Sequence, residues 1–199
     1  INENPEIDMK GVVEWKDGIV GRLTKGVETL VKSSGAELIN GWATFTSSKQ
    51  CSVKTKEGEI LIEAENVIIA TGSTHIDLPF MPCDEKFVLS STGALNLQKV
   101  PKKVAIVGGG YIGLELGCAL SKLGSEVTVI EGMDSILAIM DKEIRRPLEI
   151  WLKKNKVIVH TNSLARGTKI KGKGASSKVE LTFEKNSEEQ KIIVDKELK

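Results

Sequence analysis

The feature that most constrains the fold is a glycine-rich turn near the middle of the chain, placed directly after an apolar run. Residues 104–107 read VAIV and are followed at once by GGGYIG at residues 108–113, a G-x-G-x-x-G pattern. The next residues predict a helix over 111–123 and a second strand over 127–130, which leads into Glu131, 23 residues after the first glycine. A strand, this turn, a helix and a strand followed by a carboxylate are the parts of a dinucleotide-binding βαβ unit. The sequence therefore predicts an α/β protein with a parallel sheet.

Each glycine of the pattern has a separate physical task. Gly108 permits the tight turn, and Gly110 has no Cβ, so that a pyrophosphate can approach the backbone. Gly113 lets the helix pack closely on the strand. The helix begins at Tyr111 and Ile112, where free N–H groups and a partial positive charge face the phosphates. We therefore predict that these residues bind a dinucleotide.

The carboxylate at Glu131 favours NAD over NADP. It can accept hydrogen bonds from the ribose hydroxyls of NAD, whereas it would repel the additional phosphate of NADP. The two residues that follow, Gly132 and Met133, provide no arginine for that phosphate. Because FAD also binds to this kind of fold, the motif alone leaves the choice between the two dinucleotides open. The remaining alternative is a strand–helix turn with glycines that bind nothing.

The other predicted elements fall on both sides of this unit. Before it, we expect a helix from Asp8 to Ser33 that ends at Gly35, an antiparallel meander, and a strand buried on both faces. The meander strands are predicted at residues 36–39, 43–46, 52–55 and 60–64, and the buried strand at 67–70. After it, we expect a helix over 141–155 with Pro147 near its start, a strand over 157–159, and a hairpin or meander over 165–194 with a loop at 171–178.

Composition excludes several classes of protein. A net charge of +1 and an aromatic content of 4% argue against a basic nucleic-acid binder. Three cysteines far apart and two histidines, His75 and His160, show no local metal pattern, so we predict no metal site. The longest apolar stretch, residues 104–120, is interrupted by glycines and a glutamate, which argues against a membrane span. We expect a reducing compartment, either the cytoplasm of a bacterium or the mitochondrial matrix of a eukaryote.

Several segments together resemble the flavoprotein pyridine nucleotide-disulfide oxidoreductase family. VIIATGS at residues 67–73 is similar to its ATG segment, and NGWA at 40–43 is similar to a segment that passes the adenine of FAD. SSTGAL at 90–95, followed by Val100-Pro101, resembles the linker of the dihydrolipoamide dehydrogenase branch, as VAIVGGGYIGLELG at 104–117 resembles its NAD domain. The resemblance covers nearly the whole chain in the right order.

This resemblance implies two domains. Residues 1–100 correspond to the later part of an FAD-binding domain, and residues 101–199 correspond to a Rossmann-like NAD-binding domain with a parallel sheet and a β-meander. We expect the last strand of the NAD domain to lie beyond Lys199 and therefore to be missing, which would expose an edge of the first strand. The start at Ile1 and the charged end suggest an internal piece of a longer protein.

The resemblance also implies contacts to FAD. Gly41 and Ala43 correspond to residues that touch the adenine through their backbone. Ala70, Thr71 and Gly72 correspond to residues that line the FAD side of the junction between the domains. In the full-length parent, FAD is therefore expected beside NAD.

Three further positions correspond to the family's nicotinamide and adenine contacts. Glu115 matches a carboxylate near the flavin and the nicotinamide that pairs with a lysine. Tyr111 matches a tyrosine that gates the nicotinamide pocket, and Leu164 would lie near the adenine of NAD. The alternatives are that Glu115 only bonds a neighbouring residue and that Tyr111 only packs on the surface. Cys118, without a partner cysteine, reads as a small core residue.

The implied activity belongs to the parent protein. In the family, electrons pass from dihydrolipoamide to an enzyme disulfide and through FAD to NAD+. The chain has neither the closely spaced cysteine pair of that disulfide nor the His–Glu pair of the C-terminal interface domain. We therefore assign no catalytic residue and expect the chain alone to be inactive. The parent is expected to be a homodimer that serves the dihydrolipoamide acyltransferase of a 2-oxo acid dehydrogenase complex, without nucleic-acid or membrane partners.

Two other interpretations remain open at this point. The parent could be another member of the family, such as a glutathione, mercuric or NADH-dependent reductase. Alternatively, the chain is a stand-alone NAD-binding module without catalysis. Comparing the mass of the purified chain with its open reading frame distinguishes a module from a fragment.

Overall fold

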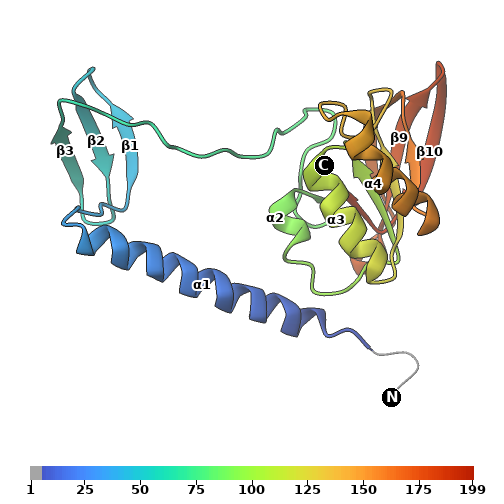
Figure 1. Cartoon of the computed structure of the whole chain (residues 1–199), viewed down its shortest axis with the longest axis horizontal. Helices are drawn as coiled ribbons and strands as arrows, with labels where there is room; N and C mark the ends of the chain where they lie inside the picture. Colours follow the sequence, from blue (N-terminus) through green and yellow to red (C-terminus); the bar gives the residue numbers. More distant parts are fainter. Residues whose placement is uncertain (1–5) are drawn as a thin grey trace. The chain divides into compact units, whose positions relative to one another are not determined.

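The structure, a computed structural model, describes residues 6–199 and divides them into two compact units (Figure 1). One unit comprises residues 15–74. The other comprises the residues up to Glu14 together with residues 75–199. Each unit is described by itself below.

A long helix, α1 (Met9–Ser33), begins and ends where the sequence predicts. Its start is capped by Asp8, whose Oδ1 accepts a hydrogen bond of 3.0 Å from the N–H of Gly11. Its end is closed by Gly35, which has a φ of +79°, and the N–H of Ala36 reaches back to the carbonyl of Val31 at 3.3 Å. This left-handed glycine is a common helix stop because it has no Cβ. The prediction of this helix and of its cap is confirmed.

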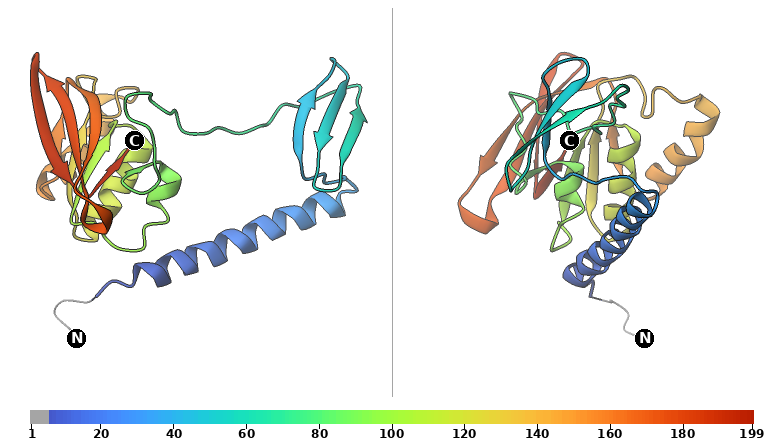
Figure 2. Two further views of the ribbon diagram at one scale, coloured as in Figure 1. Left: turned by 180° about the vertical axis from the view of Figure 1, so that it is seen from behind. Right: turned by 90° about the vertical axis from the view of Figure 1, so that its left-hand side faces the viewer.

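The unit of residues 15–74 contains the predicted antiparallel meander. Its strands are β1 (Trp42–Phe45), β2 (Gln50–Lys54) and β3 (Glu59–Glu63), paired in the order β1-β2-β3 (Figure 2). The strand predicted at residues 36–39 is wrong, because these residues pair with nothing in this sheet and only connect α1 to β1.

The buried strand predicted at residues 67–70 is also wrong. These residues form no strand, and Ile68 and Ile69 are 91% and 72% exposed. An apolar run becomes a buried parallel strand only when strands lie beside it and layers cover both faces. Among the residues that the structure describes, no strand pairs with this segment.

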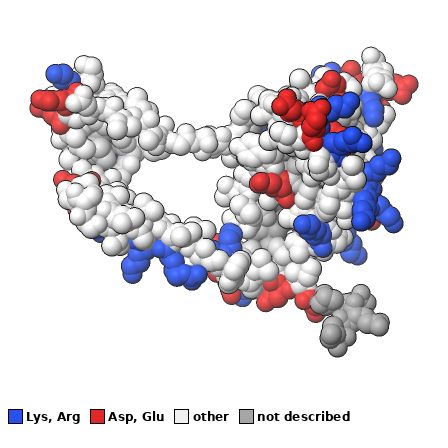
Figure 3. All heavy atoms as spheres, in the orientation of Figure 1, with Lys and Arg blue, Asp and Glu red and all other residues white. Residues whose placement is uncertain are grey.

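This unit exposes an unusual amount of apolar surface. Trp15, Leu23, Val27 and Leu30 of α1 are between 61% and 70% exposed. In Figure 3 most of the charged side chains seen on α1 lie along its lower side. Contiguous exposed apolar surface of this kind marks an interaction face.

The second unit is built around a five-stranded parallel sheet. Its strand order is β4-β11-β5-β6-β7. The strands are β4 (Val88–Leu89), β11 (Lys196–Leu198), β5 (Lys103–Val107), β6 (Glu126–Ile130) and β7 (Ile158–His160). The helices of this unit are α2 (Ser91–Ala94), α3 (Tyr111–Lys122) and α4 (Lys142–Lys154), which contains Pro147 in its second turn. The predicted strand–helix–strand unit and the parallel sheet are confirmed.

The apolar runs of the central strands form the core of this sheet. Val104 and Ile106 of β5 and Val129 of β6 are at most 1% exposed, and they pack with Leu114 and Leu120 of α3. Strands that are covered on both faces require such unbroken β-branched runs.

The exposed edge expected on the first strand, β5, is not observed. The residues just before Lys199 form β11, which pairs in parallel with both β5 and β4, so that β5 has a neighbour on each side. This strand is difficult to predict from the sequence, because Lys196-Glu197-Leu198 is short and mostly charged. Its partner strands also lie about a hundred positions earlier in the chain. The units also differ from the boundary expected at residue 100, since β4 and α2 belong to the same unit as β5.

The C-terminal part contains the predicted meander. Strands β8 (Ser163–Lys171), β9 (Lys178–Lys185) and β10 (Glu188–Val194) pair antiparallel, with a short 3-10 turn at Gly174–Ser176 between the first two. Val179, Leu181 and Phe183 of β9 are buried and pack against Ala105 and Ile130 of the parallel sheet. The meander therefore covers one face of the sheet. Within the described residues, no helix has the length and apolar character needed to cross a membrane.

Candidate functional site

The glycine-rich turn has the geometry that the sequence predicts. Gly108 has a φ of +104°, and its N–H donates to the carbonyl of Ile130 at 2.8 Å, so the turn is tied to the end of β6. Gly110 is extended, with φ −77° and ψ 174°, and directly precedes α3. The turn therefore leads the chain from β5 into α3 with only one residue in the left-handed region.

The glycines at positions 113 and 110 differ in what surrounds them. A Cβ on Gly113 would lie 2.6 Å from the carbonyl oxygen of Gly108 and 2.9 Å from Cγ2 of Ile106. A Cβ on Gly110 would meet no atom within 4 Å. Gly113 is thus required by packing, whereas the fold does not require a glycine at position 110. The open space over Gly110 fits a ligand that approaches the backbone.

Glu131 is hydrogen-bonded into the turn. Its Oε2 accepts from the N–H of Gly109 at 2.5 Å, and its Oε1 accepts from the N–H of Met133 at 2.7 Å. A carboxylate has about four lone-pair positions, so it can still accept hydrogen bonds from a ribose. The sequence alone indicates only a ligand-binding role for Glu131. The structure shows that it also joins the glycine-rich turn to the loop after β6.

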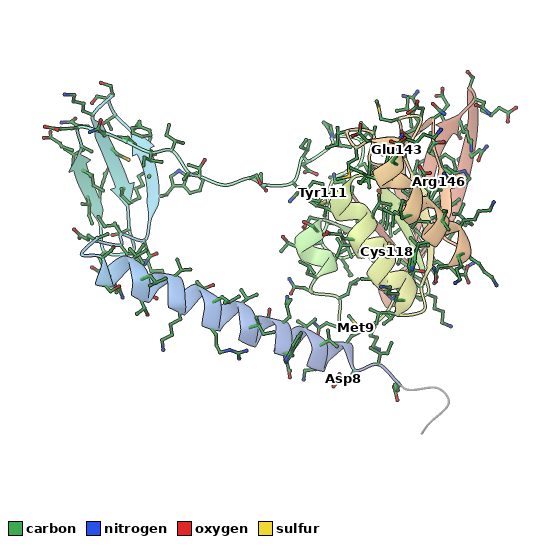
Figure 4. All side chains as sticks on the ribbon, in the orientation of Figure 1. Asp8, Met9, Tyr111, Cys118, Glu143 and Arg146 are labelled. Carbon is green, nitrogen blue, oxygen red and sulfur yellow. The ribbon has the colours of Figure 1, made fainter. Side chains whose placement is uncertain are left out.

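The start of α3 presents open donors and exposed side chains. No side chain caps this helix, so its first N–H groups have neither an intrahelical nor a side-chain acceptor. Tyr111, labelled at the start of α3 in Figure 4, is 59% exposed, and Ile112 is 46% exposed. Glu115 lies one turn further on the same helix face as Tyr111 and is also exposed. This end of the helix is suited to bind an anion.

Leu164 lies beside the loop that follows Glu131. A Cβ on Gly132 would be 3.0 Å from Cδ2 of Leu164, whose side chain is 51% exposed. The structure thus brings together Leu164, Glu131, the glycine turn and the start of α3. These are the residues predicted to bind NAD, and their donors and acceptors fit a dinucleotide.

The residues predicted to contact FAD form no common site. A Cβ on Gly41 would be 2.5 Å from the carbonyl oxygen of Lys54, so the close approach of β2 requires this glycine. Ala43 is exposed on β1, and residues 70–72 are exposed in a segment without strands. Because Ala43 and residues 70–72 are exposed rather than enclosed, these residues show no fit to a flavin, and we derive no chemistry through FAD from them.

His160 and Cys118 both pack against buried groups. The ring of His160 packs on that of Phe183 with 5.1 Å between the centroids, and burial lowers the pKa of this histidine. Cys118 is half-buried against the core of the parallel sheet, and burial raises the pKa of its thiol.

The structure brings out two features that sequence reasoning missed. Side chains of His75, Cys83 and Glu85 lie near one another, although no recognised metal-binding spacing connects them. Glu197 of β11 is fully buried, although it sits in a charged run. The burial of Glu197 could not be predicted from the short charged run around it, because its burial depends on the strands that lie beside β11.

Comparison with known proteins places the chain in a family. Residues 2–196 match the family described as Pyridine nucleotide-disulphide oxidoreductase, and the chain belongs to that family. It is 40% identical over 193 residues to a dihydrolipoyl dehydrogenase of Geobacillus stearothermophilus, covering 97% of this chain and 40% of the relative. It is 38% identical over 193 residues to the mitochondrial dihydrolipoyl dehydrogenase of Pisum sativum, covering 96% of this chain and 38% of the relative. The chain thus spans about two fifths of these relatives.

Solved structures agree with this assignment. The structure of LpdA from Mycobacterium tuberculosis superimposes with a TM-score of 0.85 at 21% identity, over 98% of this chain and 43% of that one, and shows the fold. The HOCl-induced flavoprotein disulfide reductase RclA from Escherichia coli superimposes with a TM-score of 0.76 at 28% identity, over 94% of this chain and 41% of that one. The resemblance, the Rossmann-type α/β fold, and FAD and NAD as the cofactors of this class are confirmed.

Proposed function

We propose that this chain binds NAD(H) as part of a flavoenzyme that reoxidises dihydrolipoamide with NAD+ for a 2-oxo acid dehydrogenase complex. The observation that carries the proposal is the carboxylate of Glu131, held against the glycine turn beside the open space over Gly110. The identity to dihydrolipoyl dehydrogenases supports the choice of substrate. As in the sequence analysis, we propose a homodimeric parent that works with a dihydrolipoamide acyltransferase in the bacterial cytoplasm or the mitochondrial matrix.

The residues of the site have distinct tasks in this proposal. The N–H groups at the start of α3 bind the pyrophosphate, and Gly110 lets it approach. Glu131 accepts hydrogen bonds from the adenosine ribose, and Leu164 contacts the adenine. Tyr111 covers the nicotinamide pocket and Glu115 orients the groups beside it. NAD+, when bound, supplies a hydride acceptor.

The preference for NAD(H) over NADP(H) can be tested by removing the charge of Glu131. We expect NADH to bind about tenfold or more tightly than NADPH, because the additional phosphate meets a fixed carboxylate. Glu131→Gln keeps an acceptor oxygen but removes the charge, so the ratio of the two dissociation constants should narrow. Isothermal titration calorimetry with both nucleotides measures this ratio.

The matched control is Glu126→Gln at the start of the same strand, β6. Glu126 is exposed and pairs with Lys103 at 3.1 Å, away from the turn. Its replacement should leave the ratio unchanged. Equal binding of NADH and NADPH by the unmodified chain would contradict the proposed NAD specificity.

The chain alone is expected to lack dihydrolipoamide:NAD+ activity. Its three cysteines stand at positions 51, 83 and 118, so the sequence contains no closely spaced pair for a redox disulfide. A purified, reduced chain supplied with FAD should therefore produce no NADH from dihydrolipoamide in a spectrophotometric assay. Steady NADH production would refute this expectation.

A further inference from the structure

Three metal-ligating side chains meet in the segment that precedes β4. The nearest ligand atoms of His75, Cys83 and Glu85 all lie within 4.8 Å of one another. Cys83 is half-buried, and the other two side chains are exposed, so the group is open to solvent on one side. All three belong to the unit that contains the parallel sheet.

Hydrogen bonds to neighbouring carboxylates hold the backbone of this segment in place. Oδ1 of Asp84 accepts from the N–H groups of Lys86, Phe87 and Val88 at 2.9, 2.6 and 2.8 Å, which folds the chain tightly between Cys83 and β4. The N–H of Cys83 donates to Oδ1 of Asp77 at 3.0 Å. Cys83 and Glu85 flank Asp84 in sequence, so both are attached to an ordered turn.

The same segment is tied to the end of the described chain. Nζ of Lys199 lies 2.9 Å from Oδ1 of Asp77 and also donates to the carbonyl of Met81. The Lys199 side chain is 4% exposed. Its ammonium is paired with Asp77. Of the three ligand side chains, Glu85 also accepts a hydrogen bond of 3.4 Å on Oε2 from the N–H of Ser90, and its other carboxylate oxygen is the one offered to a cation.

The donor set identifies the kind of ion. An imidazole nitrogen, a thiolate sulfur and a carboxylate oxygen are the three ligand types that Zn²⁺ takes, and a fourth tetrahedral position can hold water. Tetrahedral bonds of 2.0–2.3 Å place ligand atoms about 3.3–3.8 Å apart. The ligand atoms here lie up to 4.8 Å apart. Side-chain movements of about one ångström would therefore bring them to the tetrahedral distances.

We propose that His75, Cys83 and Glu85 form a binding site for a divalent cation of borderline softness, with Zn²⁺ as the best fit. The Cys83 thiol loses its proton to solvent as Sγ binds the ion, so a thiolate and a carboxylate together balance the charge of the cation. The bound ion links the connector before residue 78 to the turn that leads into β4. None of these three residues belongs to the proposed dinucleotide site.

The test uses Co²⁺ as a spectroscopic substitute for Zn²⁺ on the reduced 199-residue chain. We expect one equivalent of Co²⁺ to produce a thiolate-to-cobalt charge-transfer absorption, and one equivalent of Zn²⁺ to remove it. Cys83→Ser should abolish this absorption, while His75→Ala and Glu85→Gln should each weaken Co²⁺ binding by about tenfold or more.

Cys51→Ser and Cys118→Ser are the matched controls, because both thiols are half-buried like Cys83 but lie outside the group. Both should retain the full absorption. Circular dichroism establishes that each variant is folded as the unmodified chain is. An absent charge-transfer band, or a band that survives in folded Cys83→Ser, would overturn the proposal.

Discussion

Replacing Gly110 by alanine is expected to weaken NADH binding by about tenfold or more, a loss of about 1.4 kcal/mol. The free energy of unfolding should fall only by about 0.5–1 kcal/mol, because alanine is less favourable than glycine at this N-cap. The Cβ of the new residue would meet no protein atom within 4 Å, and its backbone angles suit any residue. The only group expected to meet this Cβ is the pyrophosphate of the bound nucleotide.

Gly113→Ala is expected to behave in the opposite way. Its Cβ would press on the carbonyl oxygen of Gly108 and on Ile106, at 2.6 and 2.9 Å. Forcing an additional carbon into a packed helix–strand contact costs about 1–3 kcal/mol. We therefore expect a lower free energy of unfolding, with a weakened affinity that follows from the distorted turn.

Urea unfolding and calorimetric titration of NADH on both variants separate the two effects. Gly110→Ala should change mainly the dissociation constant for NADH, and Gly113→Ala should lower mainly the urea midpoint of unfolding. If Gly110→Ala bound NADH as tightly as the unmodified chain, the pyrophosphate would not pass over this position, and the proposed site would be wrong.

The second large effect is expected at Glu197, which lies in the middle of β11. Its side chain is fully buried, and one oxygen accepts a hydrogen bond of 2.7 Å from Oγ1 of Thr168. The other oxygen, Oε1, has no hydrogen-bond partner among the residues that the structure describes. Burial raises the pKa of Glu197 from 4.5 to about 7, although Thr168 and Lys199 act to lower it.

This shift makes the stability of the fold depend on pH. Because the folded state binds the proton more tightly than the unfolded state, the contribution of Glu197 is fully present below about pH 4.5. It is lost as the pH rises through about 7, where the carboxylate is charged without a full set of partners. A shift of this size corresponds to roughly 3 kcal/mol.

Glu197→Gln has a similar shape and cannot ionise, so this contribution no longer changes with pH. We expect the variant to gain up to roughly 3 kcal/mol over the unmodified chain between pH 4.5 and pH 8. Urea unfolding at both pH values measures the difference, which also cancels the effects of all other carboxylates. Glu126→Gln, at an exposed position, is the control and should show no such change. A difference that stays constant with pH would show that Glu197 does not titrate as its burial implies.

The sequence by itself determined the elements whose signals are local. The turn at Gly108 and the tight fit at Gly113 follow from the absence of a Cβ, and α3 and β6 follow from apolar runs of the right period. The meander and the cap at Asp8 rest on neighbours a few residues away. Such contacts are encoded within one short stretch, so reading the stretch is sufficient to predict them.

Only the tertiary structure decided the features that depend on distant partners. Residues 67–70 read as a buried strand but remain exposed, because no strand pairs with them in the described chain. β11 reads as a charged tail but lies between β4 and β5, and this position buries Glu197. His75 reaches Cys83 and Glu85 only because the segment before β4 folds back on itself. Strand pairing, burial and the meeting of side chains are set by which segments pack together, and that choice is made by the whole fold rather than by any one stretch.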